Sequence, residues 1–270
     1  MVGKKSDTIG RMGASKRYKG KDCAYCGEPG STSTKDHVVP RALFLDSERG
    51  PALHIPQVAA CSRCNNEKSE LENYVLSALL IGSRHAEGSR YRREKVAPRL
   101  DRNQKLRNEL NIDAPPVWTE VNGILQRLHV IKIDAEKVHR LITLIVRGLY
   151  RHHYGKPLPH EMMPDVMMIR PESEGAMRAA FADCFPPEMP RINIDLGHGS
   201  FIYSCVQSPA HEGITAWVIG IHGMIPLLGQ DGSADHWWCV TGPTPEAIAA
   251  EAARSQVLTV RGRGSLRRGD

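Results

Sequence analysis

The sequence predicts an α+β protein: a small N-terminal module of two strands and a helix, then a basic helical segment, then a small α/β C-terminal domain. Two CxxC pairs, at residues 23–26 and 61–64, bracket the small module. Apolar residues recur at helical spacing in residues 135–154, which predicts a long amphipathic helix. Short apolar and β-branched runs after residue 190 predict the strands of the C-terminal domain.

The composition favours a globular protein with a polyanionic partner. The 270 residues are enough for one large domain, or for a small domain and a medium one. Lys and Arg number 36 against 30 Asp and Glu, a net charge of +6. The N-terminus is polar, and the most apolar run, residues 214–229, is interrupted by His222 and Pro226. We therefore expect a cytoplasmic protein without a signal peptide and with no membrane partner.

The two CxxC pairs predict a structural zinc site. Four thiolates supplied as two close pairs suit the tetrahedral coordination of a structural Zn²⁺. The gap between the pairs is wider than in a usual zinc ribbon, so we expect the metal to clamp the base of an excursion. The predicted ligands are Cys23, Cys26, Cys61 and Cys64.

The excursion carries DHVVP at residues 36–40, and the second pair runs into CNNEK at residues 64–68. With CAYCG at residues 23–27, these motifs resemble those of the HNH endonucleases, which have the ββα-metal fold. The resemblance covers residues 23–74 and is much weaker beyond them. It implies a metal-dependent endonuclease that hydrolyses phosphodiester bonds, with double-stranded DNA as the expected substrate.

The resemblance assigns roles residue by residue. His37 matches the general base that deprotonates the attacking water. Asp36 and Asn65 match the two protein ligands of one divalent cation, Mg²⁺ or Mn²⁺. The family's Asn that orients the catalytic imidazole has no counterpart before the second CxxC pair. His54 lies closest to that place and is assigned its role.

The chemistry of these residue types agrees with that reading. A hard cation on a carboxylate and an amide oxygen neutralises a phosphate and stabilises the leaving group. An imidazole with a pKa of about 6.5 accepts the proton of water at neutral pH. For His54 three roles stay open: it orients His37, it binds the scissile phosphate, or it is a loop residue that faces solvent.

Basic residues predict where DNA lies. Residues 1–22 form a basic arm without apolar periodicity, expected to be disordered in isolation and to lie along phosphates. Residues 83–111 form a second basic stretch, in which Arg92 and Arg93 are the expected contacts. Arg41, after the DH pair, and Lys68, one turn into the first helix, are expected to contact phosphates near the site.

The remaining elements follow from periodicity and turn residues. Val38 and Val39 predict a strand that Pro40 ends. Residues 57–60 predict the return strand and residues 64–80 a helix, with Glu67, Glu70 and Glu72 on its solvated face. Residues 118–133 predict one or two strands, and Gly155 and Pro157 end the helix at 135–154. A helix is expected at 173–183, and strands at 191–194, 200–206, 215–221 and 237–240.

We divide the chain into a basic arm (1–22), the nuclease module (23–82), a basic linker and helical segment (83–134), a C-terminal α+β domain (135–243) and a short helix with a basic tail (244–270). The C-terminal domain shows no phosphate-binding loop, nucleophile elbow or second metal motif. It is expected to place substrate, to form a homo-oligomer or to bind a regulatory partner.

A second hypothesis belongs to a different functional class: a non-catalytic zinc-knuckle protein that binds nucleic acid through a degenerate HNH core. The missing Asn favours this alternative. The presence of Asp36, His37 and Asn65 together favours catalysis, because a protein that only binds nucleic acid has no need of all three. Incubation with plasmid DNA and Mg²⁺ or Mn²⁺ discriminates between the two hypotheses.

Overall fold

The computed structural model describes residues 17–51, 53–81, 86–121, 123–169, 175–176, 179, 185–186, 188–209, 211–222 and 236–247. It is a mixed α+β structure with an N-terminal β-hairpin, a set of helices and a five-stranded antiparallel C-terminal sheet. Most of the predicted basic arm, of the helix predicted at 173–183 and of the C-terminal helix and tail lies outside the described residues. Among the helices in the described ranges, none is long and apolar enough to cross a membrane.

The N-terminal region folds as a hairpin followed by a helix. β1 (Thr34–His37) and β2 (Gln57–Ala60) pair in antiparallel register, with His37 opposite Gln57. Between them lies a short 3₁₀ helix, η1 (Arg41–Leu43), and after them comes α1 (Ser62–Ile81). β2 has its predicted bounds. β1 ends at His37, before Val38 and Val39, where the strand was expected to continue to Pro40. Val38 and Val39 are fully buried in the core, and the backbone N–H of Val38 still donates to the Pro56 carbonyl oxygen at 2.9 Å.

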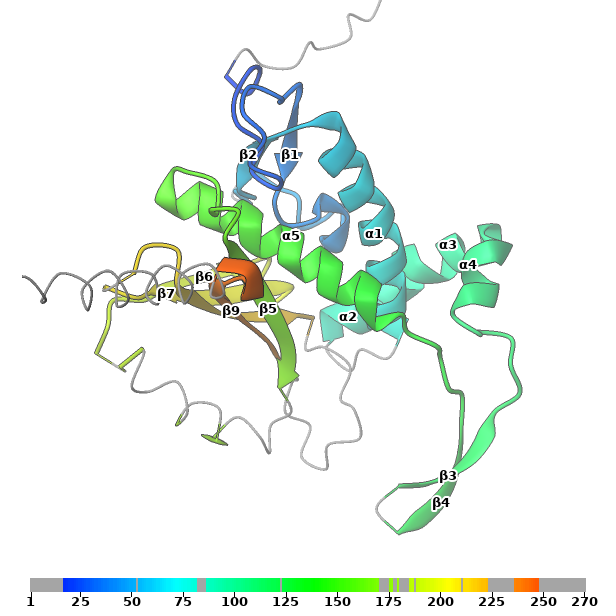
Figure 1. Ribbon diagram of the computed structural model, residues 1–270. Helices are drawn as coiled ribbons and strands as arrows, with labels where there is room; N and C mark the ends of the chain where they lie inside the picture. The colour runs from blue at the N-terminus through cyan, green and yellow to red at the C-terminus, as the bar shows by residue number, and fades with distance from the viewer. Residues whose placement is uncertain are drawn as a thin grey trace, which may run out of the picture.

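α5 (Ala135–Tyr154) has its predicted bounds and lies between the N-terminal hairpin and the C-terminal sheet (Figure 1). The Asp134 side chain caps its first turn by accepting from the backbone N–H groups of Glu136 and Lys137. Gly155 ends the helix in a left-handed conformation, with φ of 75°. The helix packs closely on the N-terminal module at Gly148. A Cβ at this position would lie only 2.7 Å from Val38 Cγ1, so a larger residue would not fit without a shift.

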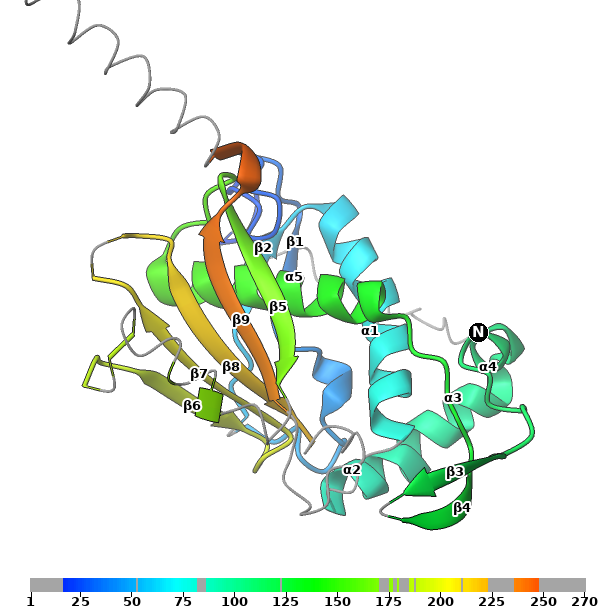
Figure 2. The same cartoon turned by 60° about the horizontal axis from the view of Figure 1, so that its bottom comes forward.

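The basic segment is helical, as predicted. It consists of α2 (Ala86–Tyr91), a π-helical turn (η2, Arg92–Val96), α3 (Ala97–Arg102) and α4 (Gln104–Glu109). A second hairpin follows, β3 (Val117–Val121) and β4 (Ile124–Leu128), which extends away from the helices in Figure 1 and is drawn below α3 and α4 in the turned view of Figure 2. Trp118 on this hairpin is 66% exposed.

The C-terminal sheet has the order β5-β9-β8-β7-β6. Its strands are β5 (Met162–Ile169), β6 (Ile192–Leu196), β7 (Phe201–Gln207), β8 (Thr215–Ile221) and β9 (His236–Pro243). The four predicted strands are present, β8 with its predicted bounds. β5 was not predicted, because Pro164 interrupts its pattern. The strand tolerates Pro164 because it lies at the edge of the sheet.

Residues at one end of the C-terminal sheet also contact the segment that follows β1, at Leu43, Phe44 and Glu48. His222 Nε2 lies 3.0 Å from the Leu43 carbonyl oxygen, and Ser200 Oγ lies 3.4 Å from a Glu48 carboxylate oxygen. A Cβ at Gly197 would lie 2.7 Å from the Phe44 ring. One hydrophobic core therefore runs from the N-terminal hairpin and α1 through α5 into the sheet.

Candidate functional site

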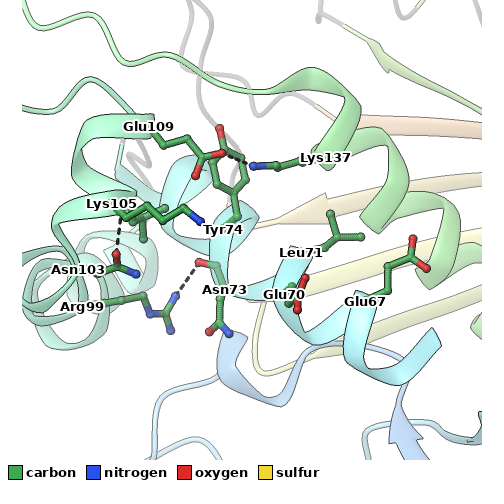
Figure 3. Close-up of a pocket in the computed structure, with 11 residues that line it drawn as sticks. Glu67, Glu70, Leu71, Asn73, Tyr74, Arg99, Asn103, Lys105, Glu109 and Lys137 are labelled. Carbon is green, nitrogen blue, oxygen red and sulfur yellow. Dashed lines mark hydrogen bonds and ion pairs between the residues drawn. The ribbon is translucent and has the colours of Figure 1, made fainter. Parts of the chain in front are cut away.

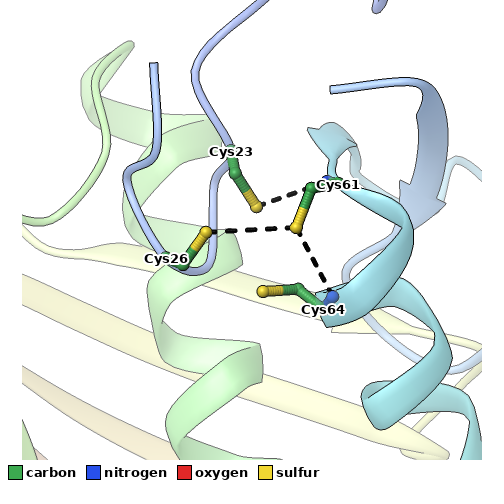
Figure 4. Close-up of side chains that lie close together, drawn as sticks. All are labelled: Cys23, Cys26, Cys61 and Cys64. Carbon is green, nitrogen blue, oxygen red and sulfur yellow. Dashed lines mark hydrogen bonds between the residues drawn. The ribbon is translucent and has the colours of Figure 1, made fainter. Parts of the chain in front are cut away.

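The four cysteines of the CxxC pairs converge, as Figure 4 shows. Their Sγ atoms all lie within 4.8 Å of one another, and Cys26 Sγ is 4.0 Å from Cys61 Sγ. Tetrahedral Zn–S bonds of about 2.3 Å imply sulfur–sulfur distances of about 3.8 Å. The backbone N–H groups of Cys61 and Cys64 donate to Cys23 Sγ and Cys61 Sγ, at 3.4 and 3.5 Å. The cluster is compatible with a structural Zn²⁺.

Burial and a neighbouring guanidinium affect the protonation of the cluster's thiols. Burial raises the pKa of the Cys23 and Cys64 thiols, so without a cation these groups favour the protonated form. A coordinated divalent cation deprotonates its thiol ligands outright. A hydrogen bond with Cys26 raises the pKa of the exposed Arg63 guanidinium, which places a positive charge beside the thiolates.

His37 lies at the end of β1 in a small pocket of about 320 Å³. The other lining residues are Arg41, Arg49, Gly50, Pro51, Leu53, His54, Ile55 and Gln57. Burial lowers the pKa of His37, and nearby Arg41, Lys35 and Lys68 act in the same direction, while Asp36 opposes them. The imidazole is therefore neutral at neutral pH, the form that accepts a proton.

The residue that contacts the His37 ring is Gln57. Its Nε2 lies 2.9 Å from His37 Nε2 across the β1–β2 pair. His54 shares the pocket but is exposed, so the structure gives the contact with His37 to Gln57 rather than to the predicted His54. The strand register contains the signal for Gln57, because a residue directly opposite His37 presents its side chain on the same face.

Asp36 lies next to His37 in β1, where neighbouring side chains point to opposite faces. Its Oδ2 accepts a hydrogen bond from Tyr25 Oη and lies 3.0 Å from Lys68 Nζ. Burial raises the pKa of Tyr25 well above its usual value, so the phenol keeps the proton that it donates. Lys68 Nζ also donates to the His37 carbonyl oxygen at 2.8 Å and pairs with Glu72.

Two expectations about α1 are wrong. Lys68 is fully buried, so it offers no charge to a phosphate on the surface. The Glu72 side chain is only 19% exposed and is not on a solvated face; burial raises its pKa, and the Lys68 ammonium opposes that effect. Both residues share a helical stripe with buried Val75 and Leu79. That spacing of four and three residues was the signal in the sequence.

The other predicted site residues lie on three different elements: α1, η1 and η2. Asn65 is half-buried in the first turn of α1, and its backbone N–H donates to the Cys61 carbonyl oxygen at 3.0 Å. Arg41 is exposed at the His37 pocket. Arg92 is exposed but donates to the Ile81 carbonyl oxygen at 2.9 Å, and Arg93 is exposed.

Acidic side chains neutralise part of the second basic stretch. Lys95 pairs with Asp46 at 2.7 Å, Arg90 pairs with Glu94 at 2.9 Å, and Arg107 pairs with Asp113. The stretch therefore presents less free positive charge than its composition indicates.

A larger cavity of about 710 Å³ lies among α1, α3, α4 and the start of α5 (Figure 3). Its lining includes three acidic and three basic side chains: Glu67, Glu70, Glu109, Arg99, Lys105 and Lys137. Lys137 Nζ lies 4.3 Å from the centre of the Tyr74 ring and pairs with Glu109. None of the predicted site residues lines this cavity. Its balanced charge does not indicate one class of ligand.

Comparison with protein-family models found no match, and neither curated proteins nor solved structures matched the chain.

Proposed function

We propose that this protein is a metal-dependent HNH endonuclease that hydrolyses phosphodiester bonds in double-stranded DNA. The observation that carries the proposal is the placement of His37. The neutral imidazole contacts Gln57 and lies in a pocket that Arg41 and Arg49 also line. His37 and Gln57 belong to the β1–β2 hairpin, which the four clustered cysteines flank in the sequence. A base next to two guanidinium groups suits attack on a phosphate.

In this reading His37 takes the proton of the attacking water. Gln57 sets which ring nitrogen does so. With its amide nitrogen toward the ring, Gln57 donates to Nε2 and occupies that lone pair. A half-turn of the amide brings Oε1 to the same place, where it accepts from Nε2–H and leaves the Nδ1 lone pair for the water. We assign the second arrangement to the reacting state.

A carboxylate oxygen of Asp36 and the amide oxygen of Asn65 are ligands that suit a hard cation. Asp36 Oδ2 has two partners, whereas Oδ1 has no hydrogen-bond partner in the described part of the chain. Asn65, at the start of α1, would add an amide oxygen. Mg²⁺ or Mn²⁺ bound by these two residues would neutralise the phosphate and stabilise the leaving oxygen. The Zn²⁺ of the cysteine cluster would be structural.

The arginines bind and orient the phosphate. Arg41 is exposed beside His37, so it is open to a phosphate that enters the pocket. Arg49 donates to the Phe44 carbonyl oxygen at 3.0 Å and pairs with Asp46 at 2.7 Å, which fixes its guanidinium in the wall. Arg93 and Arg92 would contact the duplex outside the pocket.

The test is conversion of supercoiled plasmid to nicked or linear DNA by zinc-loaded protein. We expect cleavage with Mg²⁺ or Mn²⁺, loss of cleavage in EDTA, and cleavage by His37→Ala that is about 10²–10⁴-fold slower than by wild type. Cleavage by His37→Ala at the wild-type rate would attribute the activity to a contaminant or to another site.

One observation favours the second candidate, a non-catalytic zinc protein that binds nucleic acid. The Lys68 ammonium already contacts Asp36, the carboxylate that the cation would need. In that case DNA binding persists, no cleavage occurs with either cation, and Asp36→Asn leaves DNA affinity unchanged.

A further inference from the structure

A buried charged cluster lies where β1 meets α1. Lys68, with 0% exposure, contacts the carboxylates of Asp36 and Glu72 and the carbonyl oxygen of His37. Tyr25 Oη donates to the same oxygen of Asp36 that Lys68 contacts. The Asp36 and Glu72 side chains are 16% and 19% exposed, so the cluster is largely shielded from water. The roles proposed above for His37 as base and for Asp36 and Asn65 as cation ligands do not involve Glu72.

The charges of the cluster do not cancel. Two carboxylates and one ammonium leave a net charge of −1 in a place where solvent screens charges weakly. Glu72 is the excess group, because Lys68 and Asp36 alone form a neutral pair. An uncompensated buried charge is destabilising unless a further partner neutralises it.

We propose that Glu72 is a positioning residue whose carboxylate allows Lys68 and a divalent cation to share Asp36. The inference rests on the proposed function. Without Glu72, a divalent cation entering beside the ammonium would raise the local charge from 0 to +2. With Glu72, the charge rises from −1 to +1, and the single negative charge of a phosphodiester then returns it to 0.

Glu72 also determines where the ammonium lies. It binds Lys68 from one turn further along α1, while Asp36 Oδ2 and the His37 carbonyl oxygen bind it from β1. The ammonium therefore stays between helix and strand and occupies only Oδ2 of Asp36. Oδ1 has no hydrogen-bond partner in the described part of the chain, so it is the oxygen that would take the cation.

The test is a charge series measured by Mn²⁺ binding, with electron paramagnetic resonance of zinc-loaded protein at pH 8 and no DNA. Wild type has a cluster charge of −1, Glu72→Gln 0, Lys68→Met −2, and the double variant −1. We expect Glu72→Gln to bind Mn²⁺ at least about tenfold more weakly and Lys68→Met to bind it more tightly. The double variant should return close to wild type.

Glu70→Gln is the matched control, since Glu70 is exposed on α1 and lines the other cavity. It should leave Mn²⁺ affinity unchanged. A purely structural role for Glu72 would lower the unfolding temperature of Glu72→Gln without changing its Mn²⁺ affinity, and that result overturns the inference. If Lys68→Met does not fold, the comparison of Glu72→Gln with Glu70→Gln decides alone.

Wild type separates this inference from the proposed function. If wild type binds no Mn²⁺, or if Asp36→Asn binds Mn²⁺ as well as wild type does, Asp36 is not a metal ligand. The metal-dependent function and the inference then both fail. If wild type binds Mn²⁺ at Asp36 and Glu72→Gln binds it equally well, only the inference fails.

Discussion

Gln57 Nε2 lies 2.9 Å from His37 Nε2, and the two residues face each other in the β1–β2 hairpin. A polar side chain so placed orients the imidazole and selects its tautomer. We expect Gln57→Ala to lower kcat about tenfold, because the ring loses its fixed orientation while its base strength remains. KM should change little, and single-turnover cleavage of a defined duplex measures both. His54→Ala and His54→Asn should keep wild-type kinetics; a larger loss in either than in Gln57→Ala would restore the orienting role to His54.

Removal of the proposed base should stop the chemistry without removing the fold. His37→Ala is expected to lower the cleavage rate about 10²–10⁴-fold, the contribution of general base catalysis. DNA affinity should remain near wild type, since the arginines of the pocket are unchanged. Quenched-flow or gel assays give the rate and fluorescence anisotropy gives the affinity. A rate within tenfold of wild type would mean that His37 is not the base.

The cysteine cluster should contribute to folding through its metal. Cys61→Ser is expected to abolish zinc binding and to destabilise the chain, since structural zinc contributes folding free energy on the order of 10 kcal/mol. Elemental analysis should find about one zinc per wild-type chain. Cys205→Ser, which removes a buried thiol from β7, is the control and should keep its zinc. Normal zinc content in Cys61→Ser would contradict the assignment.

Phosphate contacts should make DNA binding sensitive to salt. Arg41→Glu and Arg93→Glu are expected to weaken binding to all sequences alike, and each lost contact should reduce the slope of log K against log salt by about 0.9. Anisotropy between about 50 and 200 mM salt measures this. Arg127→Glu makes the same charge change at an exposed site in β4 and should have a smaller effect. If all three variants weaken binding equally, Arg41 and Arg93 do not contact phosphates directly. The effect would then come from the net positive charge of the protein attracting DNA at long range.

The half-buried imidazole of His153 should make stability depend on pH. Burial lowers the pKa of His153 to about 4, below its ordinary value of 6.5. The unfolded chain therefore takes up this proton first, so the stabilising contribution is complete above pH 6.5 and is lost as the pH falls toward 4. Because solvent screens a half-buried group, we expect a loss on the order of 1–2 kcal/mol.

Urea unfolding at pH 7.5 and pH 5 measures that loss. His153→Gln keeps a polar partner for Tyr203, whose Oη lies 3.0 Å from His153 Nε2, but it cannot take up the proton. This variant should show a smaller fall in stability between the two pH values. His139→Gln, at an exposed position of α5, should behave as wild type. An unchanged fall in His153→Gln would assign the pH dependence to other groups.

Elements with a strong periodic pattern were predictable, because local physics decides them. α5 and β2 have their predicted bounds, and the cysteine cluster follows from the spacing of thiols alone. The HNH reading itself, its catalytic residues and its DNA partner remain predictions. β5 escaped prediction because its Pro164 is compatible with a strand only at a sheet edge, which is a property of the tertiary arrangement.

The site was predictable at its backbone positions and less so at its side-chain contacts. A strand at this point could be read from the sequence, although it ends at His37 and was expected to end at Pro40. The partner of the His37 ring depends on strand register, and register is a tertiary property. The environment of Lys68 was likewise decided by packing. An isolated lysine on a helix is normally solvated. Lys68 is enclosed because β1 approaches α1 and adds Asp36 to the carboxylate of Glu72 on its own helix.

The bare backbone of Gly148 lets α5 lie directly against Val38 and Tyr25. Tyr25 also donates to Asp36. The buried base of the site is therefore formed both by the N-terminal hairpin region and by α5, a helix more than a hundred positions away in the chain. A fragment that stops after α1 would expose this floor to water and would lose the partner that keeps Tyr25 buried. We therefore expect the N-terminal segment to fold poorly in a chimeric protein on its own. The chimera should also include α5, or a helix with an equally small residue where Gly148 contacts Val38 and Tyr25.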